Sequence, residues 1–256
     1  MTATGGPAMK DERIAVVTGA SGGIGSRVSA GLAERGYVVV GLDRAGDGVV
    51  SCDVTDSDQV ARAFAQVADR HGRIDVLVLS AGVSAIGGFG DHDLEVHRRV
   101  MEVTHFAAVA CVQAALPALR IARGRVVLLG SVAGFAPVLG RPAYVAAKHA
   151  VTGLFEAIRP ELRAQGVALT IVHPTFVRGG MTEVAPRRSG AVRPVTGPEL
   201  TSDQVAEQVL LGIERGRDRV LVGRTARLAW VGSRHLPATY RRLMERQLGG
   251  VPGGES

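Results

Sequence analysis

Tyr144 and Lys148 are the two residues of this sequence whose types and spacing best suit proton transfer. The chain has only one other lysine, Lys10, and its other permanent cations are arginines. Side chains four residues apart on a helix project from one face, with Cβ atoms about 5–6 Å apart. A neighbouring ammonium favours phenolate and can lower a tyrosine pKa by about 1–3 units from about 10. The pair predicts a general acid/base working near neutral pH; the alternative is a chance pair on an amphipathic helix.

A glycine-rich segment at residues 18–25, TGASGGIG, follows an apolar strand predicted at 14–17 and opens a predicted helix. Glycines at such a turn let backbone N–H groups approach a pyrophosphate, whose charge is favoured at a helix N-terminus. The spacing G-x-x-x-G-x-G is a variant of the dinucleotide fingerprint G-x-G-x-x-G. It predicts a dinucleotide site, although a plain strand-to-helix turn uses the same residues. The candidates are Gly19, Ser21, Gly23, Ile24 and Gly25.

Asp43 ends the next predicted strand, about 20 residues after Gly25, where an acid hydrogen-bonds the adenosine ribose and repels a 2′-phosphate. This position favours NAD over NADP. Arg44 follows and supports the opposite choice if it contacts that phosphate, whereas Gly22 offers the phosphate no cation. The alternative for Asp43 is a solvated turn acid.

Strands and helices alternate along the chain, which predicts one α/β domain with a Rossmann-type, doubly wound parallel sheet in three α/β/α layers. The strands are near-continuous Val/Ile/Leu runs, as expected when helices cover both faces. We predict a flexible N-terminus at 1–12, the domain at 13–223 with a substrate loop at about 175–200, and a basic segment and tail at 224–256. The expected strands are 14–17, 37–42, 75–79, 125–129, 167–172 and 219–222, and the expected helices are 24–35, 57–70 capped by Ser57, 91–115, 142–164, and 202–214 capped by Thr201 or Ser202.

Composition excludes several classes of function. The net charge is +6, but aromatic residues make up only 4% and no run of five basic residues occurs, which disfavours nucleic-acid binding. Cys52 and Cys111 have no C-x-x-C spacing, so we expect neither a disulfide scaffold nor a metal site, and a reducing cytoplasm fits. The start of the chain shows no secretion signal, and the apolar stretch 106–119 is too short to span a bilayer. We expect a soluble, cytoplasmic protein.

Taken together, the motifs resemble those of the short-chain dehydrogenase/reductase family over residues 13 to about 223. The motifs occur in the family's order: TGASGGIG at 18–25, Asp53-Val54, Ser80-Ala81-Gly82, Ser131, Tyr144-x-x-x-Lys148 and His173-Pro174. The resemblance implies hydride transfer between a nicotinamide cofactor and a carbonyl or alcohol. It implies that Tyr144 exchanges the substrate proton, that Ser131 hydrogen-bonds the same oxygen, and that Lys148 holds the nicotinamide ribose and supports Tyr144.

The same resemblance implies further cofactor contacts. Asp53 and Val54 would meet the adenine, Ala81 and Gly82 would line the cofactor, and Pro174 to Val177 would border the nicotinamide, with the Val177 amide facing its carboxamide. Thr182 would touch phosphate or carboxamide. Each could instead be plain loop structure, and His173 is expected to be structural.

The sequence departs from the family pattern at several positions. Ser80 replaces an Asn, and Thr104 aligns with the family's catalytic Asn in a chain that contains no asparagine. Because that Asn acts partly through its backbone carbonyl, we predict that Thr104 keeps a working proton relay. Thr175 and Gly179 replace the family's Gly and Thr. Of the contacts that the resemblance implies, the cofactor contacts in this loop therefore have the least support from the sequence.

The leading functional prediction is an NAD(H)-dependent oxidoreductase acting on a secondary alcohol or ketone, with an apolar substrate. The alternatives are an NADPH-dependent 3-oxoacyl-type reductase and a non-catalytic NAD(P)-sensing regulatory protein. The resemblance implies a homodimer or homotetramer formed through residues 91–116 and 143–164, where Ala143, Ala146, Ala147 and Ala150 would permit close helix contact. The basic segment at 224–248 is expected to cover the substrate cleft or a neighbouring subunit; peripheral contact with an anionic membrane is the alternative.

Overall fold

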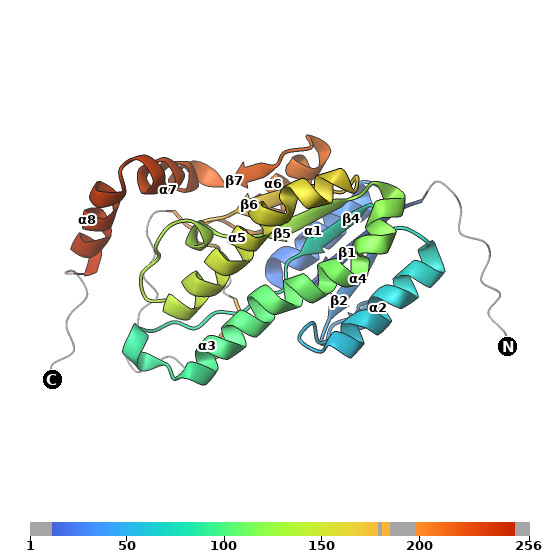
Figure 1. Cartoon of the computed structure of the whole chain (residues 1–256), viewed down its shortest axis with the longest axis horizontal. Helices are drawn as coiled ribbons and strands as arrows, with labels where there is room; N and C mark the ends of the chain where they lie inside the picture. Colours follow the sequence, from blue (N-terminus) through green and yellow to red (C-terminus); the bar gives the residue numbers. More distant parts are fainter. Residues whose placement is uncertain (1–11, 179–180, 185–197, 249–256) are drawn as a thin grey trace.

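The computed structural model describes residues 12–178, 181–184 and 198–248, and shows one sheet between layers of helices (Figure 1). In the described residues the sheet is 7-stranded, in the order β3-β2-β1-β4-β5-β6-β7, and each neighbouring pair is parallel. The predicted doubly wound α/β fold is confirmed. The strands are β1 Arg13–Thr18, β2 Tyr37–Asp43, β3 Val50–Ser51, β4 Val76–Leu79, β5 Arg125–Leu129, β6 Ala168–His173 and β7 Arg219–Leu221.

Helices cover both faces because each central strand is apolar on both sides. In β1, Ala15 and Val17 join the core under α1 (Gly23–Glu34) and α6 (Ser202–Glu214). Ile14 and Val16, which alternate with them, join the opposite core. The helices of that second layer are α2 Ser57–His71, α4 Ala107–Ala122 and α5 Pro142–Ala164. A side-chain period of two therefore builds the three layers from one short strand.

The strand order reverses at β1. The chain passes from β1 to β2 and β3 on one side, whereas β4 and the later strands add on the other side. In open α/β sheets the ligand crevice lies at the carboxyl ends of the strands beside such a switch point. The topology therefore brings the segments that follow β1, β2, β4, β5 and β6 to one edge.

Several predicted boundaries were wrong in detail. Asp56, rather than Ser57, caps α2, because its side chain accepts hydrogen bonds from the Asp58 and Gln59 amides. Thr201 caps α6 in a reciprocal box with Gln204, as one of the two predictions had it. The long helix predicted at 91–115 is a short 3₁₀ turn at Phe89–Asp91, then α3 Leu94–Met101, a π-helical turn at Glu102–Phe106 and α4. The two-residue strand β3 was missed because it is too short to leave a pattern.

The combined helical run Leu94–Ala122 also corrects the prediction about membrane spanning. It has 29 residues and is long and apolar enough to cross a membrane by length and composition alone. Cys111, Ala115 and Leu119 in this run are buried in the core beside residues of α2 and β4. A core helix can have the same length and apolar composition, so this run is only weak evidence for a membrane-spanning helix.

The basic segment forms two helices, α7 Gly223–His235 and α8 Pro237–Leu248, at one end of the molecule (Figure 1). Pro237 starts α8 directly after Leu236, which ends α7. Ala226 and Ala229 of α7 are buried against Val132 and Ala136, which follow β5. The predicted flexible N-terminus lies, apart from Glu12, outside the described residues, as does most of the predicted substrate loop.

Candidate active site

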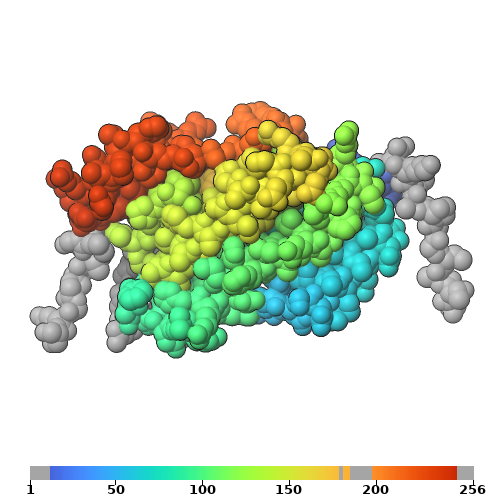
Figure 2. Space-filling model, viewed as in Figure 1, coloured from blue at the N-terminus to red at the C-terminus, as the bar shows by residue number. Residues whose placement is uncertain are grey.

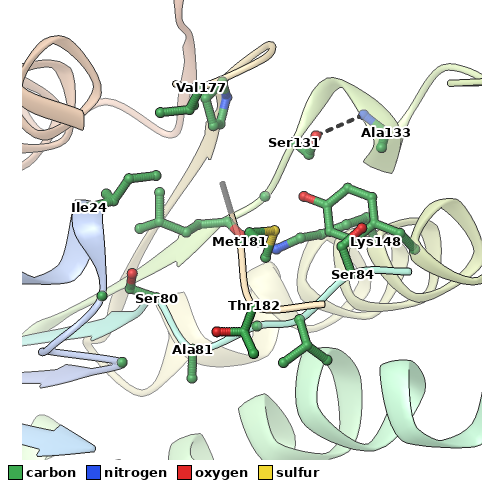
Figure 3. Close-up of a pocket in the computed structure, with 18 of the residues that line it drawn as sticks. Ile24, Ser80, Ala81, Ser84, Ser131, Ala133, Lys148, Val177, Met181 and Thr182 are labelled. Atoms are coloured by element: carbon green, nitrogen blue, oxygen red, sulfur yellow. Dashed lines mark hydrogen bonds between the residues drawn. The ribbon is translucent and has the colours of Figure 1, made fainter. Parts of the chain in front are cut away.

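A cavity of about 620 Å³ lies at the carboxyl ends of the strands. Its lining combines the glycine turn after β1 with the segments after β2, β4, β5 and β6. Figure 3 shows Ile24, Ser80 and Ala81 from the first part of the chain together with Ser131, Lys148, Val177 and Thr182. Every predicted site residue lines this cavity except Ser21 and Thr104. Predicted site residues up to 163 positions apart in the sequence thus share one site, since both Gly19 and Thr182 line it.

The glycine turn is shaped by close backbone contacts. Gly19 has φ +66°, and a Cβ there would lie 2.9 Å from the Ala81 backbone. A Cβ on Gly25 would lie 2.0 Å from the Gly19 carbonyl oxygen. Side chains are therefore excluded at both positions. The turn packs against the segment after β4, and its backbone forms one wall of the cavity.

The N-terminus of α1 fits a bound anion. Gly22 is the N-cap, provides no side-chain hydrogen bond, and the first turn carries no acid. Gly22, Gly23 and Ile24 all line the cavity. An uncapped helix N-terminus presents free N–H groups and a partial positive charge, which suits a pyrophosphate. The residues present therefore fit a dinucleotide cofactor.

Asp43 is fixed at the end of β2 by two backbone donors. Its Oδ2 accepts from the Ser21 amide at 2.9 Å, and its Oδ1 accepts from the Arg44 amide at 2.8 Å. Ser21 turns its hydroxyl to the Ala45 carbonyl oxygen at 2.7 Å. The structure thus places Ser21 as a link between the glycine turn and Asp43, outside the cavity lining. Asp43 and Arg44 both line the cavity, so the two opposed cofactor determinants lie side by side.

Asp53 lies at the same end of the cavity. Burial pushes the pKa of its carboxyl upward, but hydrogen bonds from the Thr55 amide and hydroxyl, with the charges of Arg99 and Arg44, outweigh burial and lower the pKa. Arg99 also donates to the Thr55 hydroxyl at 3.3 Å and lines the cavity. Arg99 was missed because it comes from α3, and no sequence pattern indicates that α3 brings it to Thr55.

Tyr144 and Lys148 share one face of α5, as their spacing predicted. The Lys148 ammonium lies 5.7 Å from the centre of the Tyr144 ring, and both side chains are buried. Lys148 donates to the Leu129 carbonyl oxygen, at the end of β5, at 2.6 Å. Burial lowers the pKa of the Lys148 ammonium from its usual value to about 8. This lysine therefore holds its positive charge at neutral pH but can release a proton near it.

Ser131 also lines the cavity, at the start of a 3₁₀ turn (Val132–Gly134). Its hydroxyl oxygen accepts from the Ala133 amide at 3.1 Å, which leaves its proton available to a substrate oxygen (Figure 3). Fully buried His173 supports the segment, because its Nδ1 lies 2.9 Å from the Ser131 carbonyl oxygen. Burial lowers the pKa of His173 to about 4, so the ring is neutral. This agrees with the structural role expected for His173.

The comparison with known protein families identifies the family of this fold. The family model described as short chain dehydrogenase matches residues 13–189 of this chain.

The chain belongs to the short chain dehydrogenase family.

Relatives and solved structures agree with this assignment. Dehydrogenase/reductase SDR family member 7B from Danio rerio is 32% identical over 201 residues, which cover 76% of this chain and 65% of the fish protein, less than two thirds of its length. A short-chain dehydrogenase structure from Streptomyces avermitilis has a TM-score of 0.80 at 25% identity and covers 94% of this chain and 98% of that one. One from Burkholderia cenocepacia, solved in complex with NADP, has a TM-score of 0.78 at 29% identity, with 93% and 99% covered.

The main departure from the short chain dehydrogenase pattern, Thr104, lies in the π-helical turn between α3 and α4. Thr104 is buried, and its hydroxyl has no hydrogen-bond partner among the described residues. It lies behind the cavity lining, where its Oγ1 is 3.8 Å from a Cβ built on Gly82. A π-helical turn leaves its carbonyl groups with irregular partners and is often found at functional sites. The backbone of Thr104, rather than its hydroxyl, is therefore the candidate relay group.

This placement predicts that Thr104→Val keeps turnover within about threefold of the unchanged chain, because the variant preserves shape and the backbone carbonyl while removing a buried hydroxyl without a partner. The measurement is kcat for carbonyl reduction beside that of Thr152→Val, another buried threonine with an unpartnered hydroxyl. A loss of tenfold or more in Thr104→Val alone would place the hydroxyl in the relay.

Residues beyond the motif-based site predictions also line the cavity, and four of them lie in segments that were expected to build or cover it. Arg141, before α5, places its guanidinium 5.9 Å from the Tyr144 ring centre. Met181 projects into the cavity (Figure 3). Tyr240 and Met244 reach it from α8, so this helix of the basic segment borders the cleft. The sequence predicted a segment over the cleft or a neighbouring subunit, but it did not indicate which side chains of α8 would reach the cavity. Among the described residues, no group of three or more His, Cys, Asp or Glu side chains is placed to hold a metal ion.

Proposed function

We propose that this protein is an NAD(H)-dependent oxidoreductase that interconverts a secondary alcohol and a ketone, with Tyr144 as the general acid/base. One observation carries the proposal. The uncapped, glycine-lined N-terminus of α1 and the buried set Ser131, Tyr144 and Lys148 line the same cavity. A short chain dehydrogenase that lacked catalysis would not need that set beside a dinucleotide site.

A nicotinamide cofactor, when bound, would supply or accept the hydride. The residues of the chain have the remaining tasks. In carbonyl reduction the Tyr144 hydroxyl donates a proton to the substrate oxygen, and the Ser131 hydroxyl donates a hydrogen bond to the same atom as negative charge develops on it. The Lys148 ammonium stabilises the phenolate that Tyr144 leaves behind. We propose that the backbone carbonyl of Thr104, a buried residue behind the cavity lining, takes part in the same proton relay.

We propose an apolar substrate. The apolar residues that line the cavity include Val83, Ile86, Val138, Leu139, Phe176 and Met181. Burial of apolar ligand surface against such a lining contributes about 25 cal/mol per Å². The experiment is a cofactor-linked absorbance screen of sterols, acyl derivatives and small secondary alcohols. Turnover of an apolar alcohol or ketone supports the proposal, whereas cofactor binding without any turnover over the whole panel would favour a regulatory protein.

The choice of NAD over NADP rests on Asp43, since its fixed carboxylate lines the cavity where a ribose 2′-phosphate would meet its charge. Arg44 and the relative solved in complex with NADP favour the alternative, an NADPH-dependent 3-oxoacyl-type reductase. The positive net charge of +6 would suit an acidic acyl carrier in that case.

We predict that Asp43→Asn lowers the ratio of kcat/KM for NADH over NADPH by about 10- to 100-fold, because a hydrogen bond to a charged carboxylate and its repulsion of phosphate are both lost. The two values of kcat/KM are measured side by side. Arg44→Gln is the matched control and should leave NADH use unchanged. A strong preference of the unchanged chain for NADPH would contradict the assignment.

We further propose a cytoplasmic homo-oligomer formed through α4 and α5. Phe106, which precedes α4, is 53% exposed, and Ala146 and Ala150 of α5 face outward. Ala143 and Ala147 are buried inside the chain, so the prediction that they permit contact between subunits was wrong. Light scattering of the purified chain tests the proposal, and a monomer at all concentrations would contradict it.

A further inference from the structure

Helices α7 and α8 have one side that packs against the rest of the chain and one side that is exposed. On the inner side, Ala226 and Ala229 are buried, and Tyr240 and Met244 line the cavity. On the outer side, Leu228, Val231, Leu236 and Leu243 are 71%, 53%, 59% and 52% exposed. Scattered exposed leucines are ordinary, but four large exposed apolar side chains within sixteen residues are a local concentration of apolar surface. We call the exposed side chains of the two helices the C-terminal surface.

The C-terminal surface is strongly basic. Arginines surround the four apolar side chains, whereas Glu245 is the one acid of the two helices; the arginines are Arg224, Arg227, Arg234, Arg241, Arg242 and Arg246. All six are exposed. Arg234 stacks on Trp230, with its guanidinium 3.7 Å from the ring centre, which fixes this part of α7. Exposed leucines between arginines are typical of helices that lie in the interface of a membrane.

The charge argues against a second copy of the chain as the partner. A two-fold interface brings the same surface of two subunits together. Six arginines would then face six, with only Glu245 from each copy to offset them. An anionic bilayer surface, by contrast, attracts the arginines and buries the leucines at the boundary between headgroups and acyl chains.

We propose that the C-terminal surface binds the surface of a bilayer that carries anionic headgroups. Both helices lie at one end of the molecule, so a bilayer can contact them there (Figures 1 and 2). Tyr240 and Met244 line the cavity from the same helix that carries Leu243. If the proposed function holds, on which this last step rests, an apolar alcohol or ketone dissolved in the bilayer enters the cavity beside α8.

The test is flotation of the full chain with phosphatidylcholine vesicles, with and without phosphatidylglycerol. Binding is expected only with phosphatidylglycerol and should weaken as salt is raised. Arg227→Glu/Arg242→Glu should lower the partition coefficient at least about 30-fold, because each arginine near an anionic surface contributes about 1 kcal/mol of attraction. The control Arg62→Glu/Arg70→Glu makes the same change of net charge on α2, at the other end of the molecule, and should lower it far less (Figure 1).

The apolar contribution is tested separately. Leu228→Ser should weaken vesicle binding by about tenfold, whereas Ile121→Ser on α4, which changes an equally exposed residue, should not. Equal losses in the variants and their controls would overturn the proposal, because the attraction would then belong to the whole basic chain. A fall in oligomeric mass in Leu228→Ser with vesicle binding unchanged would also overturn it. Flotation needs no turnover, so vesicle binding without activity on any alcohol or ketone would leave this inference standing while the proposed function fails.

Discussion

Tyr144→Phe should lower kcat for carbonyl reduction by about 10³-fold, within the range found for loss of a positioned general acid. The variant keeps the ring, which is buried among the residues around Val103 and Ala147, and removes only the hydroxyl. Cofactor affinity should stay within about threefold, because the glycine turn and Asp43 are untouched. An enzyme that binds its dinucleotide but cannot move the proton is therefore expected.

The measurement pairs steady-state kcat with the dissociation constant for NADH, followed by fluorescence. Tyr37→Phe is the matched control, since Tyr37 begins β2 beneath the Arg13 guanidinium and does not line the cavity. It should leave both values unchanged. If Tyr144→Phe kept a tenth or more of the activity, another group would have to supply the proton.

Lys148→Met should lower kcat about 100-fold and weaken NADH binding about tenfold. Two functions are lost together, because the ammonium stabilises the Tyr144 phenolate and, by the family resemblance, hydrogen-bonds the nicotinamide ribose. Tyr144→Phe should change kcat alone, so the two variants have different signatures. Equal dissociation constants for NADH in Lys148→Met and the unchanged chain would remove Lys148 from the cofactor site.

Misfolding does not explain the expected loss in Lys148→Met. The pKa of Lys148 falls to about 8 on folding, from 10.5. Between these values the unfolded chain binds more protons, so this group makes the folded state more stable as pH rises through the window and less stable below it. At pH 7 the variant is freed of a buried charge, although the Leu129 carbonyl loses its donor. We expect a thermal midpoint at pH 7 close to that of the unchanged chain.

The sequence predicted the fold and most of the site because these features depend on local patterns. Apolar runs such as 125–129 predicted strands, and helical spacing predicted that Tyr144 lies beside Lys148. The glycines of residues 18–25 predicted a turn whose backbone makes close contacts, as Gly19 and Gly25 do. The reversal of strand order at β1 then brought separate motifs to one edge. The motifs that a short chain dehydrogenase carries in order along its chain were enough to predict this edge as the candidate site.

The missed features depend on contacts between distant segments. The π-helical turn around Thr104 follows from one extra residue in a helix, which hydrophobic periodicity does not register. Arg99 reaches Thr55 across 44 positions, and α8 turns Tyr240 toward the cavity only because α7 first packs on the turn after β5. Ser21 was assigned to the cofactor from its motif, but its amide and hydroxyl face Asp43 and Ala45.

The pH dependence of kcat/KM for carbonyl reduction tests most directly whether the cation beside Tyr144 controls the proton transfer, since kcat/KM reports groups of the free enzyme. The value should fall as pH rises through about 8, where Lys148 loses its proton and the neighbouring phenol becomes a weaker acid. In Lys148→Met the value of kcat/KM should be lower at every pH and should show no decline near pH 8. The same decline in both proteins, or a flat profile in the unchanged chain, would contradict the account.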